Sequence, residues 1–174
     1  MKFPPSSVFL VVMGVAGCGK SSLGAALAAA VGVPLIEGDD HHSAASRDKM
    51  SRGIALTDAD RAGWLQTLGR LLQAHPNGAV LTCSALKRAY RDHLRAACPG
   101  LRFAFLDIAR ADAGQRVAAR ADTHFFSTAL VDSQFATLES PVGEAGVLRL
   151  DALLPIDQLQ AQATAWLAQA ELAP

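Results

Sequence analysis

The stretch Gly14-Val15-Ala16-Gly17-Cys18-Gly19-Lys20-Ser21 decides how the rest of the sequence is interpreted. It matches the phosphate-loop pattern of a glycine, four residues, a glycine, a lysine and a hydroxyl residue. The apolar run from Val8 to Met13 precedes it and is typical of a strand buried on both faces of a parallel sheet. The run from Ser22 to Val31 predicts a helix that ends at Gly32. Strand, glycine loop and helix therefore follow one another as a phosphate loop requires.

The glycines explain the chemistry expected of this loop. They adopt backbone conformations barred to other residues and leave no Cβ between the amides and a ligand. Those amides, with the positive end of the following helix, would cradle phosphate oxygens. Lys20 would reach the β- and γ-phosphates of ATP, and the Ser21 hydroxyl would bind Mg²⁺. We therefore predict ATP-binding residues from Gly14 to Ser22; a chance glycine turn is the alternative, which the flanking segments disfavour.

Length and composition indicate one soluble globular domain. The chain has 174 residues, of which 51% are hydrophobic and 18% charged. Sixteen Lys and Arg balance sixteen Asp and Glu, so we expect neither a nucleic acid nor a membrane as partner. No later segment approaches the roughly 20 apolar residues of a membrane span.

The cysteines indicate a reducing, cytoplasmic compartment. Cys18, Cys83 and Cys98 are odd in number and lack CxxC spacing, which favours neither a disulfide framework nor a zinc site. A competing interpretation takes the N-terminus as a bacterial lipoprotein signal ending at Cys18. It would cut the phosphate loop in two, and Pro4-Pro5 is unusual in a charged leader. We therefore favour the phosphate loop.

Strands and helices alternate along the rest of the chain, which predicts an α/β fold. Further strands are expected at 33–36, 79–83, 101–107 and 147–151, and helices at 46–53, from Thr57, after Cys83, at 113–120 and from Pro155. Thr57 and Asp60 have the spacing of a capping box. Trp64 begins a series of apolar residues at helical spacing, so we expect it in the core rather than as a platform for a sugar.

Acidic residues leave the second expected strand at its carboxyl end, in the segment Glu37-Gly38-Asp39-Asp40-His41-His42. Ligands bind at that edge of an open parallel sheet, so these side chains would lie beside the phosphate loop. Asp39 is the candidate general base, and Glu37 the candidate to hold Mg²⁺ through water. An ordinary solvated loop is the alternative.

Basic residues follow the third strand. Ser84 leaves that strand as a predicted helix cap, and Lys87, Arg91 and Arg95 then share one helix face. A basic row that starts at the binding edge could meet an anionic substrate. The alternative is a solvated face, above all for Arg95.

The segment from about 116 to 141 predicts a helical lid. Arg116 and Arg120 share one face of its first helix, and His124-Phe125-Phe126 stands before an amphipathic run. Arginines on a lid can neutralise phosphoryl charge when the lid closes and excludes water.

Together these stretches closely resemble the gluconokinases, small phosphate-loop kinases related to shikimate and nucleoside monophosphate kinases. The resemblance extends from about Val8 to the last helix. Its most particular stretches are Cys83-Ser84-Ala85-Leu86-Lys87, Tyr90-Arg91-Asp92 and His124-Phe125-Phe126, and Ser133-Gln134-Phe135 is among the other matching stretches.

The resemblance implies a single P-loop kinase domain over residues 1–174, usually as a homodimer. Its five-stranded parallel sheet would have the order 2-3-1-4-5, with helices on both faces. The substrate-binding segment would be about 38–64 and the lid about 116–141. The implied reaction is ATP-dependent phosphorylation of D-gluconate at its 6-hydroxyl to give 6-phosphogluconate.

The resemblance also distributes roles among residues. Lys20, Asp39 and Arg120 would be catalytic, and Arg116 and Arg120 resemble the pair that stacks on adenine and clamps phosphate. The residues expected to bind the substrate are Asp39, His42, Lys49, Ser84, Lys87 and Arg91, with Lys87 and Arg91 preferred for its carboxylate over Arg47 and Lys49.

This sequence departs from the family pattern at several positions. The segment Arg120-Ala121-Asp122-Thr123-His124 is one residue longer than usual and lacks a glycine, and Glu37, Ser43, Ser46 and Ala55 replace an aspartate, a proline, an asparagine and a proline. Two other functions remain open: a kinase for another small hydroxylated acceptor, and a nucleotide-sensing module without turnover.

Overall fold

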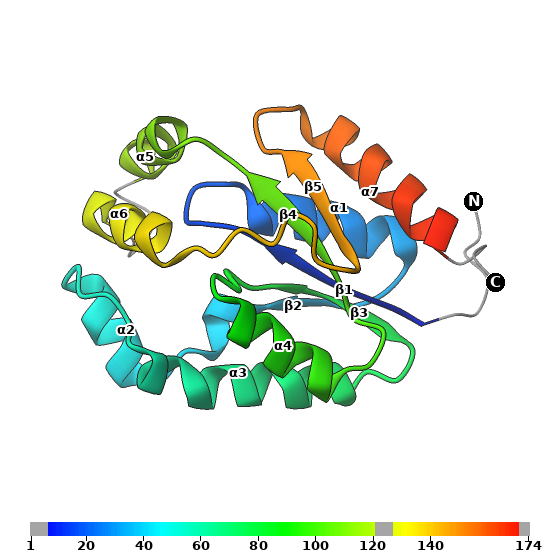
Figure 1. The fold of residues 1–174 in the computed structure, drawn as a ribbon, viewed down its shortest axis with the longest axis horizontal. Helices are drawn as coiled ribbons and strands as arrows, with labels where there is room; N and C mark the ends of the chain where they lie inside the picture. Colours follow the sequence, from blue (N-terminus) through cyan, green and yellow to red (C-terminus); the bar gives the residue numbers. More distant parts are fainter. Residues whose placement is uncertain (1–6, 121–126, 171–174) are drawn as a thin grey trace.

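A parallel five-stranded sheet forms the centre of the molecule (Figure 1), whose computed structural model describes residues 7–120 and 127–170. The sheet has the order β2-β3-β1-β4-β5, as expected. Its strands are β1 (Val8–Met13), β2 (Leu35–Glu37), β3 (Gly78–Thr82), β4 (Arg102–Asp107) and β5 (Val147–Asp151).

The apolar composition of β1 explains its central position. It pairs with β3 on one side and β4 on the other, so that Val11 lies opposite both Leu81 and Phe103. All three side chains are completely buried. Because helices cover both faces of the sheet, the central strand has no polar side, as the unbroken apolar run predicts.

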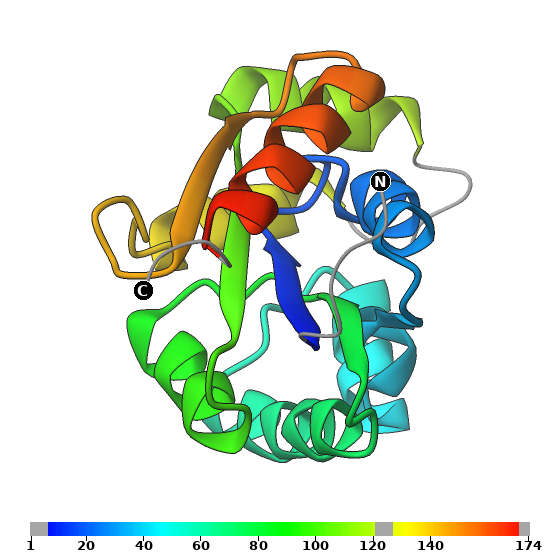
Figure 2. The same ribbon diagram turned by 90° about the vertical axis from the view of Figure 1, so that its right-hand side faces the viewer.

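Helices form a layer on each face of the sheet (Figures 1 and 2). One layer contains α1 (Lys20–Val31) and α7 (Ile156–Ala170), and the other contains α3 (Asp58–Gln73) and α4 (Arg88–Ala97). Burial of the apolar residues between these layers and the sheet forms the main core.

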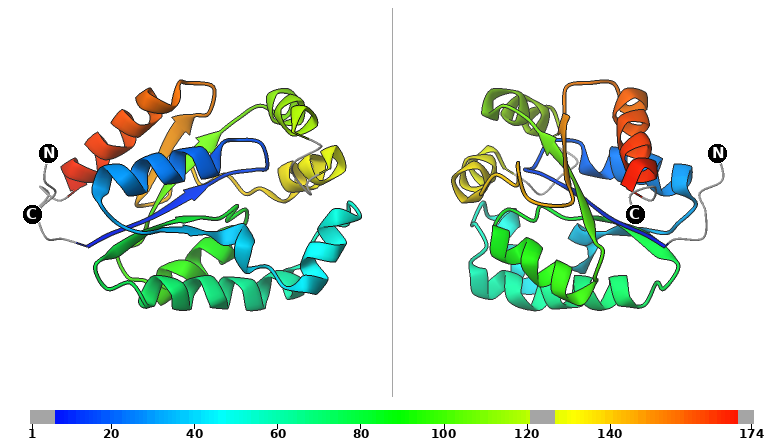
Figure 3. Two further views of the ribbon diagram at one scale, coloured as in Figure 1. Left: turned by 180° about the vertical axis from the view of Figure 1, so that it is seen from behind. Right: turned by 45° about the vertical axis from the view of Figure 1, so that its right-hand side comes forward.

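The remaining helices gather at the carboxyl end of the strands, where the phosphate loop also lies (Figure 3). They are η1 (Gly38–His41), α2 (Ala44–Ser51), α5 (Arg110–Ala119) and α6 (Thr128–Thr137). In the described residues, no helix is long and apolar enough to cross a membrane.

Most local predictions are confirmed. Gly32 ends α1 with a φ of 73° and donates its N–H to the Ala28 carbonyl. Both hydrogen bonds of the Thr57–Asp60 capping box are present at the start of α3. The last helix, expected from Pro155, is present as α7, although Ile156 at its start is 43% exposed.

The prediction that Ser84 caps a helix is wrong. Helix α4 begins at Arg88, with Lys87 as its N-cap residue. The chain between β3 and α4 turns instead at Ala85, whose φ is +47°. Ser84 therefore lies in a loop at the sheet edge, where it lines the pocket described below.

Candidate active site

The phosphate loop joins β1 to α1 and has a backbone that only glycine adopts readily. Gly14, Gly17 and Gly19 have φ angles of +148°, +82° and +98°. A Cβ on Gly17 would lie 2.8 Å from the Ala113 carbonyl oxygen, so a side chain there would also collide with α5. The loop can therefore expose its amides beside the N-terminus of α1.

Lys20 and Ser21 stand at the first turn of α1. The Lys20 ammonium donates to the carbonyl oxygens of Gly14 and Val15 at 3.0 and 3.1 Å, which folds the side chain over the loop. The first turn of α1 contains no acidic residue. Its positive end is therefore left to attract an anion.

The two residues predicted to hold Mg²⁺ are in contact. Ser21 Oγ donates to Glu37 Oε2 at 3.0 Å, and the Thr82 hydroxyl donates to the same oxygen at 2.6 Å. Among the described residues there is no group of three His, Cys, Asp or Glu side chains that could hold a metal ion. Mg²⁺ is commonly bound by one or two carboxylates together with substrate phosphates and water, so a hydroxyl beside a carboxylate fits it.

Asp39 and His42 form a second group opposite the loop. His42 Nε2 lies 3.5 Å from Asp39 Oδ1, and the imidazole stacks on Trp64 with ring centroids 4.2 Å apart. Trp64 is anchored by donating its indole N–H to the Gly38 carbonyl at 2.8 Å. His42 Nδ1 is buried and has no hydrogen-bond partner within residues 7–120 and 127–170, which makes it available to a ligand hydroxyl.

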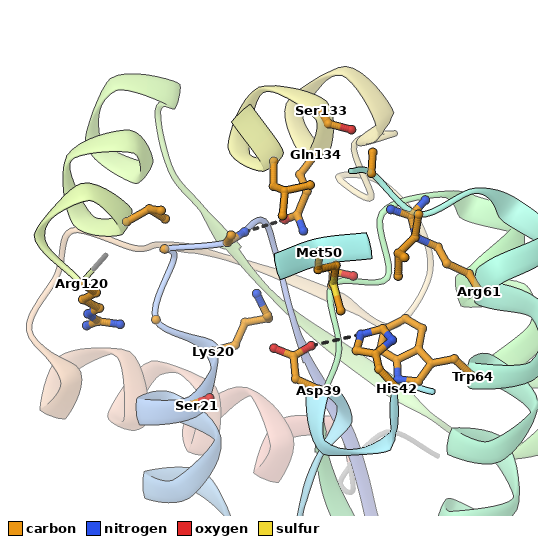
Figure 4. Close-up of a pocket in the computed structure, with 18 of the residues that line it drawn as sticks. Lys20, Ser21, Asp39, His42, Met50, Arg61, Trp64, Arg120, Ser133 and Gln134 are labelled. Carbon is orange, nitrogen blue, oxygen red and sulfur yellow. Dashed lines mark hydrogen bonds and ion pairs between the residues drawn. The ribbon is translucent and has the colours of Figure 1, made fainter. Parts of the chain in front are cut away.

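A single pocket brings the two groups together (Figure 4). Lys20 and Asp39 point toward each other across it, with His42 and Trp64 on the Asp39 side. Trp64 is only 6% exposed, so it belongs to the core, as predicted, and also lines this pocket. Its other lining residues include Gly17, Gly19, Ser21, Ser22, Ser84 and Arg120.

Sequence reasoning assigned no role to three polar residues of this pocket, Arg61, Ser133 and Gln134. Arg61 is 8% exposed, and its guanidinium donates to the Tyr90 hydroxyl at 3.2 Å. The Tyr90 hydroxyl in turn donates to Asp58. The helical spacing from Arg61 to Trp64 and Leu65 places it on the buried face of α3, and this signal could have identified it.

The expectation that Arg91 binds the substrate carboxylate needs correction, because the structure buries this residue elsewhere. Its side chain is fully buried and pairs with Glu144, with 2.6 Å between Nη2 and Oε1. The guanidinium also donates to the carbonyl oxygens of Ala85, Leu86 and Glu139. These bonds engage all of its nitrogens inside the protein, away from the pocket with the phosphate loop.

Lys87 and Lys49 also lie outside the lining of the pocket. Lys87 pairs with Asp58 at 3.0 Å, and Lys49 pairs with Asp60 at 2.8 Å. The structure therefore does not place either lysine in the pocket with Asp39 and His42. Their partners come from the start of α3, which no local sequence pattern links to these lysines.

The two arginines of the predicted lid, Arg116 and Arg120, occupy different positions. Arg120 lines the pocket. Arg116 lies against the loop instead, with Nη1 3.4 Å from the carbonyl oxygens of Gly17 and Cys18 and Nη2 3.0 Å from that of Ala152. The predicted lid residues Ala121-Asp122-Thr123 and His124-Phe125-Phe126 lie outside the described residues.

Comparison of the sequence with known proteins identifies its family and its relatives. Residues 9–141 match the family model described as an AAA domain. The chain is 43% identical to a gluconokinase of Gluconobacter oxydans, over 82% of this chain and 81% of that protein. It is 40% identical to the thermosensitive gluconokinase of Escherichia coli, over 81% of this chain and 77% of that protein.

A solved gluconokinase structure resembles this chain over nearly its whole length. The crystal structure of a gluconokinase from Sinorhizobium meliloti covers 98% of this chain, and this chain covers 97% of it, at 42% identity and a TM-score of 0.86. The APS kinase of Mycobacterium tuberculosis is 20% identical, with a TM-score of 0.67. At that identity the likeness shows the P-loop kinase fold alone.

Proposed function

This chain belongs to the gluconokinase family, and we propose that it transfers the γ-phosphoryl group of ATP to the 6-hydroxyl of D-gluconate. The products are 6-phospho-D-gluconate and ADP. The observation that carries this proposal is the single pocket in which the phosphate-loop lysine, Lys20, faces the carboxylate of Asp39.

Phosphoryl transfer requires positioning and charge neutralisation more than covalent chemistry from the protein. The loop amides, Lys20 and Arg120 would hold the phosphates of ATP and offset the charge of the transferred group. Asp39 would orient the attacking hydroxyl and accept its proton. Bound Mg²⁺ would supply further positive charge beside the phosphates, and Ser21 and Glu37 are the residues that would hold it.

For the acceptor we propose Arg61 in place of Arg91 as the cation that meets the gluconate carboxylate. Arg61 lines the pocket on the same side as Asp39 and His42, whereas Lys20 and Arg120 belong to the phosphate side. The hydroxyls of the sugar acid would then meet Ser84 and His42, whose buried Nδ1 has no hydrogen-bond partner among the described residues.

Replacing Arg61 tests this assignment. Arg61→Met should raise the KM for gluconate about 10- to 100-fold, the scale of a lost charged hydrogen bond, with little change in the KM for ATP. Arg88→Met is the matched control, because Arg88 is 68% exposed and outside the pocket. An unchanged KM for gluconate in Arg61→Met would refute the assignment.

The reaction itself is tested by ADP release from ATP and Mg²⁺. The assay is run without an acceptor and then with D-gluconate, shikimate, other sugar acids and nucleoside monophosphates. Release that depends on gluconate is the expected result. Release with another acceptor alone would overturn the choice of substrate, and ATP binding without release under any acceptor would favour a nucleotide-sensing module.

We also propose that the protein works as a cytoplasmic homodimer. Dimerisation is implied by resemblance to the family, and a reducing compartment suits three cysteines that are all buried free thiols. Light scattering coupled to size-exclusion chromatography should give about twice the 18.2 kDa mass of one chain. A mass of one chain at micromolar concentration would contradict the dimer.

A further inference from the structure

The phosphate loop is bonded to a helix that lies far along the chain. The Ala16 amide donates a buried hydrogen bond of 2.7 Å to Oε1 of Gln134, which belongs to α6 and is 118 residues away (Figure 4). Gln134 is only 8% exposed. Since Ala16 lies among the amides that form the phosphate cradle, the side chain bonded to its amide influences the shape of that cradle.

Further contacts to the loop come from Lys20 and Arg116 and engage its carbonyl groups, and Lys20 Nζ also lies 4.0 Å from Cys18 Sγ. Lys20 donates to the carbonyl oxygens of Gly14 and Val15, and Arg116 approaches those of Gly17 and Cys18. A loop rich in glycine has many accessible conformations. A buried bond to the Ala16 amide therefore restricts the loop at a position between the two flexible residues Gly14 and Gly17.

The same helix also contacts the acceptor side of the pocket. Leu130, four residues before Gln134 and hence on the same helix face, is buried with Met50 and Leu56 in an apolar cluster separate from the main core. Met50 belongs to α2, and Leu56 lies in the connection to α3. The side chains of Met50, Leu56, Leu130 and Gln134 all line the pocket. One face of α6 therefore extends from the acceptor segment to the phosphate loop.

We propose that Gln134 is a positioning residue that couples occupation of the acceptor site to the phosphate loop. An acceptor bound against the α2–α3 connection would restrict α6 through the Leu130 cluster, and Gln134 would then hold the Ala16 peptide in place for the nucleotide. The coupling is reciprocal, so ATP tightens acceptor binding by the same factor. This inference rests on the proposed function, because gluconate is taken as the acceptor.

Calorimetric titration with a non-hydrolysable ATP analogue and Mg²⁺ tests the coupling, with and without saturating gluconate. In the wild type, gluconate should tighten binding of the analogue about fivefold or more. In Gln134→Met, which keeps a similar volume but lacks the carbonyl oxygen, the ratio should fall to within about twofold of unity. Gln134→Glu retains an acceptor oxygen and should retain the ratio, although its negative charge weakens binding of the analogue in both conditions.

Asp132→Asn is the control on the same helix, because the Asp132 side chain is 67% exposed and its ion pair with Arg110 is long, at 3.7 Å. It should leave the ratio unchanged, and thermal unfolding confirms that each variant is folded. A wild-type ratio near unity, or a ratio preserved in Gln134→Met, would overturn the coupling. Turnover of the wild type with gluconate is measured in parallel: its absence refutes the proposed function, whereas turnover with an unaltered ratio in Gln134→Met refutes the coupling alone.

Discussion

Under the proposed function, Asp39 would accept the proton of the attacking hydroxyl, and one atom of its side chain determines whether it can do so. Asp39→Asn should lower kcat about 10²- to 10⁴-fold, the usual contribution of a general base, because an amide cannot take up the proton. Steady-state kinetics with gluconate check this. Asp40→Asn, at the exposed neighbouring position, should remain close to the wild type; an effect of Asp39→Asn on KM alone would show that Asp39 only positions the substrate.

We expect the thiol of Cys18, inside the phosphate loop, to be unreactive. Cys18 is 1% exposed, and burial raises the pKa of its thiol despite the nearby charges of Lys20 and Arg116. Burial likewise raises the pKa of Cys83 to about 12, and Cys98 is 5% exposed. Because the thiolate is the reactive form, alkylation of the native protein at pH 8 should be slow at all three positions.

Mass spectrometry after timed exposure to iodoacetamide measures that reactivity. The same reagent applied in concentrated urea is the control, and it should label all three cysteines within minutes. Rapid modification of Cys18 in the native protein would contradict this prediction and would indicate that the phosphate loop opens readily.

Among the elements, α3 begins at a junction that also holds α2, within the segment of about 38–64 that is predicted to bind the substrate. The Asp60 carboxylate accepts from the Thr57 amide within the capping box and from the Lys49 ammonium of α2. These hydrogen bonds, led by that from Lys49, lower the pKa of Asp60 to about 2. One carboxylate thus fixes both the start of α3 and the end of α2, which explains how a short polar helix keeps its place.

Removing the cap of α3 should therefore destabilise the protein measurably. Thr57→Ala loses the hydroxyl that accepts from the Asp60 amide, at a cost of about 1 kcal/mol in the free energy of unfolding. Urea denaturation checks this. Thr67→Ala is the same substitution within α3, where the hydroxyl only bonds back to the Gly63 carbonyl, and it should cost less than about 0.5 kcal/mol. Equal effects of the two substitutions would contradict the role of the cap.

At the scale of the whole molecule, a buried ion pair joins α4 to the loop that leads into β5. Glu144 bonds Arg91 and Arg95, and the bonds from Arg91 contribute most to lowering its pKa from 4.5 to about 2. Glu144 is ionised in both the folded and the unfolded chain above pH 4.5, so its contribution to stability is complete there. Below that pH the unfolded chain binds the proton first, and the contribution is lost as the pH falls toward 2.

The thermal unfolding midpoint measured from pH 7 to pH 2.5 tests this dependence. At pH 7, Glu144→Gln should lower the free energy of unfolding by about 3–5 kcal/mol, because it leaves the Arg91 charge buried without its partner. The difference from the wild type should shrink below pH 4.5. Asp92→Asn, which removes a 55% exposed partner of Arg95, should cost at most about 1 kcal/mol at any pH. If the difference in stability between Glu144→Gln and the wild type stayed constant across the pH range, ionisation of Glu144 would not be the cause of the pH dependence.

Local features of the sequence predicted much of the fold. The phosphate loop, the apolar run of β1, the capping box at Thr57 and the end of α1 at Gly32 all depend on neighbouring residues, through backbone preferences and side-chain spacing. The strand order was expected from resemblance to a family and is confirmed. Contact between Ser21 and Glu37 was also foreseeable, because parallel strands end at one edge of the sheet.

The sequence by itself determined the elements and the phosphate side of the site, whereas tertiary structure decided the acceptor side. A basic row on α4 has the same pattern whether it faces a substrate or an ion-pair partner, and Glu144, 53 residues from Arg91, decided which. Tyr90 likewise anchors Arg61, and Gln134 accepts from the amide of Ala16, which is 118 residues away in the sequence. Helical spacing defines a face of a helix; only the packing of distant segments determines what that face meets.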